Sequence, residues 1–326
     1  MSTPVDTLSL LPGDSEPEGC DRADKGHGRG RVDAVNPNLV SVLRGPPPDK
    51  GDAPPGVVAA DGSGAASRVR RACAACREGG ELFPFTMAFQ PIVDLQEGRI
   101  DAYEALVRGP ANEGAAHVLG QVTPDNTYAF DQACRVKAIE LAARLGIDRQ
   151  LSINFLPNAV YEPKACIQTT LRAATRTGFP RDRLTFEILE SESIADTAHL
   201  MAIISEYRRQ GFKIALDDFA TGYSGLARLV ELKPDIIKVD RVLAQDCDKD
   251  RVRLAIIASL IALGTEIGVK VVIEGVEHAS EVRALRSAGA RFVQGFHFAR
   301  PMFEGIARDS DIAWIDPGGA GAATGA

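Results

Sequence analysis

Acidic and amide side chains follow many of the apolar runs in this 326-residue chain. They are Glu104, Asn154, Glu187, Asp217, Asp218, Asp240 and Glu274. Carboxylate and amide oxygens suit hard cations such as Mg²⁺ or Mn²⁺, whereas zinc more often binds His or Cys. Carboxylates gathered at one place repel one another unless a positive charge lies among them. If the fold brings these residues together, they predict a divalent-metal site.

Such a site suits the hydrolysis of a phosphodiester. Two metal ions can hold the attacking and leaving oxygens and lower the pKa of a bound water. Lys238 can neutralise the developing negative charge or hold that water, and the planar guanidinium of Arg108 suits a second phosphate. Glu274 is the candidate general base.

Asp217 and Asp218 are adjacent, so in a regular strand their side chains point to opposite faces. Both can face one metal only if the chain bends at this point. The following segment contains Gly222 and Gly225, which permit such a bend.

Apolar runs typical of β-strands alternate with longer amphipathic runs after about residue 81. The expected strands are Phe85–Asp94, Ala102–Arg108, Leu151–Phe155, Leu184–Leu189, Lys213–Phe219, Ile236–Asp240, Lys270–Val276 and Arg291–Phe298. The expected helices include Asp131–Leu145, Thr197–Arg209 and Arg251–Ile267. Five junctions carry a glycine suited to ending a helix: Gly146, Gly178, Gly211, Gly268 and Gly289. This order predicts an α/β fold, a (β/α)₈ TIM-like barrel whose strand ends form the site, with an open doubly wound sheet as the alternative.

Composition predicts three parts of the chain. Residues 1–80 form a Gly- and Pro-rich leader that we expect to be disordered, with a basic end containing Cys73 and Cys76. Residues 81–308 form the barrel, and residues 309–326 form a flexible Gly- and Ala-rich tail. A second Cys or His pair at finger-like spacing does not follow Cys76, which disfavours a structural zinc site.

Charge and hydropathy exclude some function classes. A net charge of −7 disfavours general binding of long nucleic acid. The most apolar stretch, Leu254–Leu263, is far shorter than the roughly 20 residues that span a bilayer. The first 20 residues lack the pattern of a secretory signal, so we expect a cytoplasmic protein without a membrane anchor.

An ordered set of motifs between about Phe85 and Phe303 resembles the EAL family, metal-dependent phosphodiesterases that open the bacterial second messenger cyclic di-GMP to linear 5′-pGpG. The matching segments are Phe89–Asp94, Glu104–Arg108, Asn154, Glu187–Glu190, Asp217–Ser224, Lys238–Asp240, Glu274–Glu277 and Gln294–Gly295. The resemblance implies an EAL-type barrel, in which one strand can be antiparallel, and cyclic di-GMP as the substrate.

The resemblance also implies roles for individual residues. Two ions, Mg²⁺ or Mn²⁺, would be bound by Glu104, Asn154, Glu187, Asp217 and Asp218. Glu274 would be the base or a second metal partner, and Lys238 would position the water. Gln90, Arg108 and Gln294 would contact the dinucleotide, Asp240 would belong to the site, and Glu190 and Glu277 would support the loop after Asp218. A homodimer coupled through that loop and its neighbouring helix is implied as well.

Two residues and one segment depart from the family pattern. Leu189 stands where the family has Thr, Ala220 stands where the loop has Gly, and the segment from Gly109 to Asp131 is short, as in EAL domains attached to blue-light sensors. None of these removes a ligand, so an active phosphodiesterase is the leading hypothesis. The alternatives are a catalytically silent module that binds cyclic di-GMP or a regulatory protein partner, and an unrelated barrel acting on another phosphoester.

Overall fold

The computed structural model describes residues 82–190, 196–222 and 225–314. The predicted leader with Cys73 and Cys76, and most of the predicted tail, lie outside the described residues. The strands are β1 (Thr86–Asp94), β2 (Arg99–Arg108), β3 (Gln150–Asn154), β4 (Leu184–Leu189), β5 (Lys213–Phe219), β6 (Ile236–Val239), β7 (Lys270–Ile273), β8 (Phe292–Gln294) and β9 (Met302–Phe303). All eight predicted strands are present, and β9 was not predicted.

The sheet closes into the predicted barrel. Strands β2 to β8 are parallel neighbours in chain order, and β1 pairs with both β2 and β8. Strand β1 is antiparallel to both of its barrel neighbours, and the short β9 pairs with its first half. Because β1 joins the two ends of the sheet, the barrel itself has no open edge. The open doubly wound alternative is therefore wrong.

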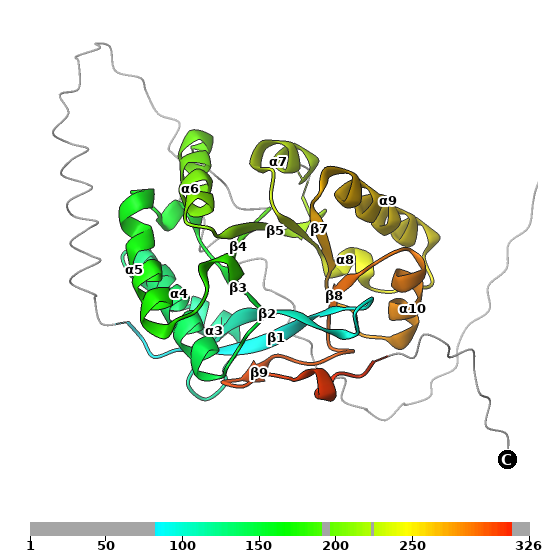
Figure 1. The fold of residues 1–326 in the computed structure, drawn as a ribbon, viewed down its shortest axis with the longest axis horizontal. Coiled ribbons are helices and arrows are strands. Elements are labelled where there is room, and N and C mark those ends of the chain that lie inside the picture. The colour runs from blue at the N-terminus through cyan, green and yellow to red at the C-terminus, as the bar shows by residue number, and fades with distance from the viewer. Residues whose placement is uncertain (1–81, 191–195, 223–224, 315–326) are drawn as a thin grey trace, which may run out of the picture. The chain divides into compact units, whose positions relative to one another are not determined.

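Helices lie outside this ring of strands, with α5, α6, α7, α9 and α10 clearly separated in Figure 1. The helices are α3 (Ala115–Leu119), α4 (Thr127–Arg144), α5 (Pro163–Thr177), α6 (Thr197–Arg209), α7 (Gly225–Leu232), α8 (Arg241–Ala244), α9 (Arg251–Ile267) and α10 (Ala279–Ser287). Short 3₁₀ turns occur at Pro157–Ala159, Arg181–Arg183 and Asp309–Asp311. The predicted bounds of α6 and α9 are confirmed, whereas α4 begins four residues earlier than predicted.

Local sequence explains where the helices begin and end. Asp250 accepts hydrogen bonds from the backbone N–H groups of Val252 and Arg253 and so caps α9. The five glycines predicted to end helices all have positive φ, between 70° and 91°. Within the described residues no helix is long and apolar enough to cross a membrane.

The last two barrel strands are shorter than predicted. The backbone N–H of Val276 donates to the carbonyl of Gln294 at 3.1 Å, and its carbonyl accepts from the N–H of His297 at 3.0 Å. A Cβ on Gly295 would lie 2.0 Å from the carbonyl oxygen of Val276, so only glycine allows this approach. The chain therefore leaves the strand at Gln294 and packs against the segment that follows β7.

The barrel interior has an apolar layer and a polar layer. Ile92, Ala102, Ala215, Ile236 and Val272 form a small buried cluster, with Phe292 packed against it. Most of the other buried apolar side chains form one large core cluster. That core continues to Ile312, past the predicted barrel boundary at residue 308; the domain boundaries themselves stay predictions.

Candidate active site

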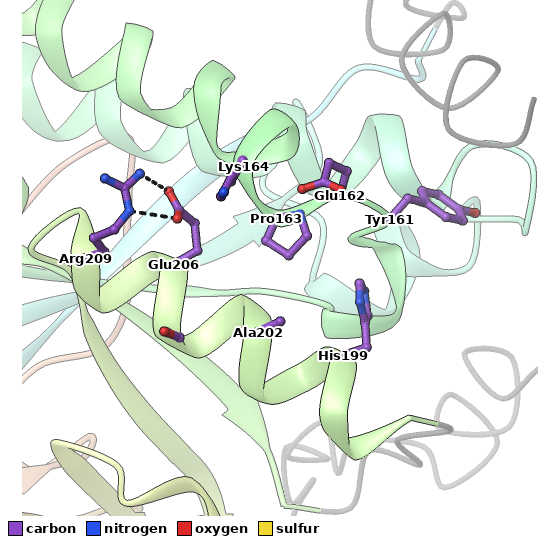
Figure 2. A pocket seen from close by; sticks show the side chains of 9 residues that line it. Tyr161, Glu162, Pro163, Lys164, His199, Ala202, Glu206 and Arg209 are labelled. Carbon is purple, nitrogen blue, oxygen red and sulfur yellow. Dashed lines mark hydrogen bonds and ion pairs between the residues drawn. The ribbon is translucent and has the colours of Figure 1, made fainter. Parts of the chain in front are cut away.

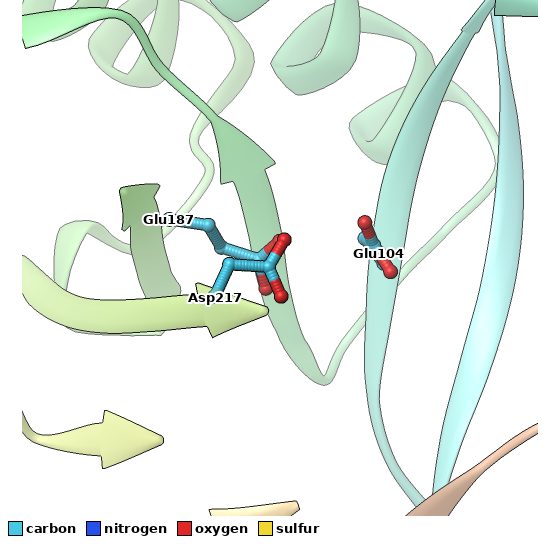
Figure 3. A group of neighbouring side chains, drawn as sticks. All are labelled: Glu104, Glu187 and Asp217. Carbon is cyan, nitrogen blue, oxygen red and sulfur yellow. The ribbon is translucent and has the colours of Figure 1, made fainter. Parts of the chain in front are cut away.

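Lys238 on β6 is the centre of a buried group of acids. Its ammonium lies 2.8 Å from Glu274 Oε1, 2.9 Å from Glu187 Oε2, 3.1 Å from Asp217 Oδ1 and 3.4 Å from Glu104 Oε2. The side chain of Lys238 is only 1 % exposed. The carboxylates of Glu187 and Asp217 point toward Glu104 across the site (Figure 3). The barrel thus brings residues from β2, β4, β5, β6 and the end of β7 to one place.

Amide side chains surround the carboxylate of Glu104. Asn154 donates to Glu104 Oε1 at 3.2 Å, and Gln294 donates to Oε2 at 2.7 Å. Gln294 also donates to the side-chain oxygen of Gln90 at 3.3 Å, and Gln90 donates to the carbonyl of Ala299 at 3.2 Å. Glu104 and Gln90 are direct partners in the register of β2 and β1, so both lie inside the barrel.

At this site, two groups of three carboxylates are close enough to share a cation. In the first, Glu104, Glu187 and Asp217 each offer an oxygen within 4.8 Å of the others, and Asp217, Asp218 and Glu274 form the second in the same way. Asp217 belongs to both groups. Oxygen donors arranged in this way fit two neighbouring Mg²⁺ or Mn²⁺ ions.

The electrostatics agree with a need for cations. Burial raises the pKa of Glu187 to about 8, even though Lys238 acts to lower it. Burial also raises the pKa of Asp218 to about 7, with the charge of Asp217 adding to the effect. The pKa values of Asp217 and Glu274 are raised by burial too. One lysine therefore does not balance the acids around it.

Glu104 differs from the other acids. Burial acts to raise its pKa, but Lys238 and the amides of Gln294 and Asn154 together lower it below the usual value. Among the acids around Lys238, Glu104 is therefore the one whose charged form the protein itself favours.

The predicted bend at Asp217 and Asp218 is present, but neither Gly222 nor Gly225 has a positive φ, so the prediction that these glycines supply the bend is wrong. Asp218 has a φ of 53°, and the pairing of β5 with β6 shifts register between Leu216 and Phe219. This left-handed residue turns the second aspartate so that both lie in one candidate cation group. Ala220 follows with a φ of 76°, a conformation that favours glycine.

The two predicted loop-supporting residues differ in their contacts. Glu190 is buried, and its Oε2 accepts from the backbone N–H of Ala220 at 2.9 Å. Glu277 lies 3.9 Å from Arg241. Within the described residues no hydrogen bond or ion pair joins Glu277 to residues 219–222. The contacts favour loop support for Glu190 only, and both roles stay predictions.

Arg108 and Asp240 lie near the acids but do not bind them directly. Arg108 is half-buried and donates to the carbonyl of Val107 at 2.8 Å. Burial lowers its pKa while the charge of Glu104 acts in the opposite direction. Asp240 caps α8 by accepting from the backbone N–H of Val242 at 2.7 Å, and its charge contributes to the raised pKa of Asp218. Their substrate-binding roles stay predictions.

Sequence reasoning missed a buried group behind β3. Arg135 on α4 donates to the hydroxyl of Tyr207 at 2.7 Å and to the carboxylate of Asp131. The other oxygen of Asp131 accepts from the backbone N–H of Leu156 at 3.0 Å, two residues after Asn154. The spacing of Asp131 and Arg135, four residues apart on a predicted helix, was the available signal.

A groove of about 860 Å³ lies between α5 and α6, away from the acids around Lys238 (Figure 2). Its lining includes Lys164, His199, Glu206 and Arg209. Arg209 and Glu206 form a double hydrogen bond of 2.9 and 2.6 Å, so these charges satisfy each other. The groove lacks the converging acids of the barrel, and the barrel is the candidate active site.

The barrel is also the part of the chain that resembles known proteins. The family model described as EAL domain matches residues 70–301. The blue light- and temperature-regulated antirepressor BluF of Escherichia coli is 31% identical over 228 residues, which are 70% of this chain and 56% of BluF. The cyclic di-GMP phosphodiesterase NbdA of Pseudomonas aeruginosa is 29% identical over 227 residues, 66% of this chain and 28% of NbdA. The chain spans about half or less of the length of these curated relatives.

Solved structures of EAL proteins are similar to this chain as well. A standalone EAL protein from Vibrio cholerae in its c-di-GMP bound form has 46% sequence identity and a TM-score of 0.68, covering 70% of this chain and 97% of that one. The manganese and cy-diGMP complex of Klebsiella pneumoniae BlrP1 has 34% identity and a TM-score of 0.66, covering 69% and 57%. With its closed barrel, its acidic site and a family match over most of the described residues, the chain belongs to the EAL-domain family.

Proposed function

We propose that this protein is a metal-dependent phosphodiesterase that hydrolyses cyclic di-GMP to linear 5′-pGpG. The observation that carries the proposal is the pair of carboxylate groups that share Asp217 around Lys238. The cyclic di-GMP phosphodiesterase NbdA and the similar structures with bound c-di-GMP and manganese support this choice of substrate and of a divalent ion.

We assign the following roles in this reaction to the residues of the site. Glu104, Asn154, Glu187, Asp217 and Asp218 would hold two ions, Mg²⁺ or Mn²⁺. When bound, the ions supply charge neutralisation and acidify water. Glu274 accepts the proton of the attacking water, and Lys238, 2.8 Å from it, holds that water in place and offsets the charge that develops on phosphorus oxygens.

Four further side chains would bind and orient the dinucleotide. Gln90 and Gln294 present amides beside Glu104, and Arg108 offers a planar fork for the second phosphate. Asp240 lies at the start of α8 beside Asp218, where it would face the substrate.

The direct test is to incubate the purified full chain with cyclic di-GMP and either Mg²⁺ or Mn²⁺. We expect 5′-pGpG as the product, and its absence with both ions would contradict the proposal. Glu206→Gln is the matched control, because Glu206 is a buried acid outside the barrel site; it should keep full turnover.

We also propose a homodimer that uses α7. This helix follows the loop after Asp218 and exposes two large apolar side chains, Leu226 at 62% and Val230 at 74%. Apolar side chains exposed on one short helix favour burial against a second copy. Light scattering should give the mass of a dimer for the wild type and of a monomer for a Leu226→Glu, Val230→Glu double variant. A monomeric wild type would refute the dimer.

The second candidate is a regulatory module that binds cyclic di-GMP or a protein partner without turnover. It is favoured by the name of BluF, an antirepressor that matches 70% of this chain. Calorimetry with cyclic di-GMP in Ca²⁺ or Mg²⁺ would support it if binding occurred without product. The expectation of a cytoplasmic protein stays a prediction.

A further inference from the structure

A small cavity lies inside the barrel, on the side of Glu187 and Lys238 that faces the amino ends of the parallel strands. Its lining includes Gln150, Lys213 and Lys270, which are the first residues of β3, β5 and β7. It also includes Thr185, and Glu187 and Lys238 close its other end. Its volume is about 20 Å³. A cavity of roughly 10–15 Å³ by this measure holds one water molecule.

Unpartnered polar atoms concentrate at this cavity. Among the described residues, eight buried side-chain nitrogen or oxygen atoms have no hydrogen-bond partner. Three of them belong to lining residues: Gln150 Oε1, Thr185 Oγ1 and Glu187 Oε1. Thr185 and Glu187 are 0% and 1% exposed. Since buried polar groups are nearly always paired, this concentration indicates a shared partner.

The three atoms match the hydrogen-bonding capacity of one water. Thr185 and Glu187 are two residues apart on β4, so their side chains share the interior face, and Thr185 is the register partner of Ser152 on β3. Gln150 lies two residues before Ser152 and shares that face as well. Two of the atoms are acceptors, and the third belongs to a hydroxyl that can donate. A water donates two hydrogen bonds and accepts from a hydroxyl.

We propose that one water molecule occupies this cavity, donating to Glu187 Oε1 and Gln150 Oε1 and accepting from the hydroxyl of Thr185. Thr185 is then a positioning residue that acts through this water on Glu187. The other oxygen of Glu187 lies 2.9 Å from Lys238. The carboxylate is therefore held from both sides, and its orientation is set before a cation arrives.

The expected effect of Thr185 on metal affinity rests on the proposed function, in which Glu187 binds a cation. Groups that orient a metal ligand typically change metal affinity roughly 10–100-fold when they are removed. If instead Glu187 Oε1 binds a cation directly and needs no support, loss of the Thr185 hydroxyl has no effect on that affinity. The two arrangements therefore differ in a binding measurement.

The chain offers a matched control for this measurement. Thr170 on α5 is also 0% exposed, and its hydroxyl also has no partner among the described residues. Thr170 does not line the cavity. Thr170→Val thus removes an equally buried hydroxyl at a site unrelated to Glu187, and Thr185→Ser keeps the hydroxyl at the proposed site.

Calorimetric titration of the full chain with Mn²⁺ tests the role of Thr185. We expect Thr185→Val to weaken Mn²⁺ binding roughly tenfold, while Thr185→Ser and Thr170→Val bind as the wild type does. Equal affinity in Thr185→Val and the wild type would overturn the positioning role. Melting temperatures without metal, measured for all variants, separate a loss of folding from a loss of affinity.

A high-resolution crystal structure of the wild type tests the water itself. We expect ordered density within hydrogen-bonding distance of Thr185 Oγ1 and Glu187 Oε1, and a dry cavity would refute the proposal. If the wild type binds no Mn²⁺, the proposed metal site fails together with the positioning role. The crystal structure still decides the water in that case, so the two failures are distinguishable.

Discussion

Two buried groups of charged side chains in this barrel differ in their balance of charge. Among the described residues, Arg135 pairs with one carboxylate, that of Asp131. It also donates to the backbone carbonyl of Asp131 and to the hydroxyl of Tyr207, and its guanidinium lies over the rings of Phe155 and Phe186. Lys238 has four carboxylates within 3.4 Å. The first group is complete as a neutral pair. The second has more acids than one lysine can balance, and this excess of acids distinguishes a place for cations from a structural ion pair.

The comparison is tested most severely by Asp217→Asn, which removes the acid shared by both candidate cation groups. Cation-assisted hydrolysis depends on several kcal/mol of charge stabilisation, so we expect turnover to fall by roughly three decades or more. The melting temperature without metal should stay the same or rise, because one of several repelling acids is gone. Turnover near the wild-type level would refute the shared role of Asp217.

The same change in the balanced group should have the opposite effect on folding. Asp131→Asn leaves the fully buried Arg135 without its counter-charge, which typically destabilises a protein by about 3–5 kcal/mol. Denaturant unfolding measures this loss. Asp148→Asn, at a carboxylate that is 79% exposed, is the control and should be nearly neutral. If Asp131→Asn were equally neutral, the Arg135 pair would not be the structural element that we describe.

The raised pKa values of the acids around Lys238 predict how stability and cation binding change with pH. The pKa values of Glu187 and Asp218 are raised to about 8 and about 7 in the folded protein. A carboxyl with a raised pKa binds more protons when folded than when unfolded, so the metal-free protein should lose stability as pH rises from about 5 to 8. Cations displace these protons and should therefore bind more tightly at pH 8 than at pH 6.

Melting temperatures with a chelator and with Mg²⁺, at pH 6 and pH 8, test this direction. We expect the stabilisation by Mg²⁺ to be larger at pH 8. A larger effect at pH 6 would contradict the predicted competition between cations and protons.

The smallest predicted effect is a change in stability caused by a substitution at Ala220, in the loop after Asp218. Ala220 has a φ of 76°, so Ala220→Gly should relieve strain and stabilise the protein by about 0.5–1 kcal/mol. Ala227→Gly on α7 is the control with the opposite sign, because glycine in a helix costs about 1 kcal/mol. Denaturation midpoints of the two variants should shift in opposite directions, and a destabilised Ala220→Gly would show that the loop is not strained there.

The barrel could be predicted because its signals are local. Alternating apolar runs and helix-ending glycines such as Gly178 and Gly268 mark each βα unit within a few residues. The two-residue β9 and the five-residue α3 could not be predicted, since so few residues show no periodicity. The early end of β8 depends on the contact between Gly295 and Val276, which lie far apart in the sequence.

The site could be predicted as residue types but not as a set of partners. Carboxylates at strand ends indicated a hard cation, and the doubled aspartate indicated a bend. The contacts of Lys238 with four acids depend on side chains from different strands meeting inside the closed barrel. The positive φ of Ala220 and the unpartnered hydroxyl of Thr185 likewise follow from the packed structure, and neither residue type signals them.

The central claim is that the excess of acids around Lys238 binds two cations that share Asp217. Calorimetric titration of the wild type and of Asp217→Asn with Mn²⁺ at pH 8 tests it most directly. We predict two Mn²⁺ ions per chain for the wild type and strongly weakened binding for the variant. A wild type that binds no Mn²⁺, or an Asp217→Asn variant that binds two ions with unchanged affinity, would contradict the claim.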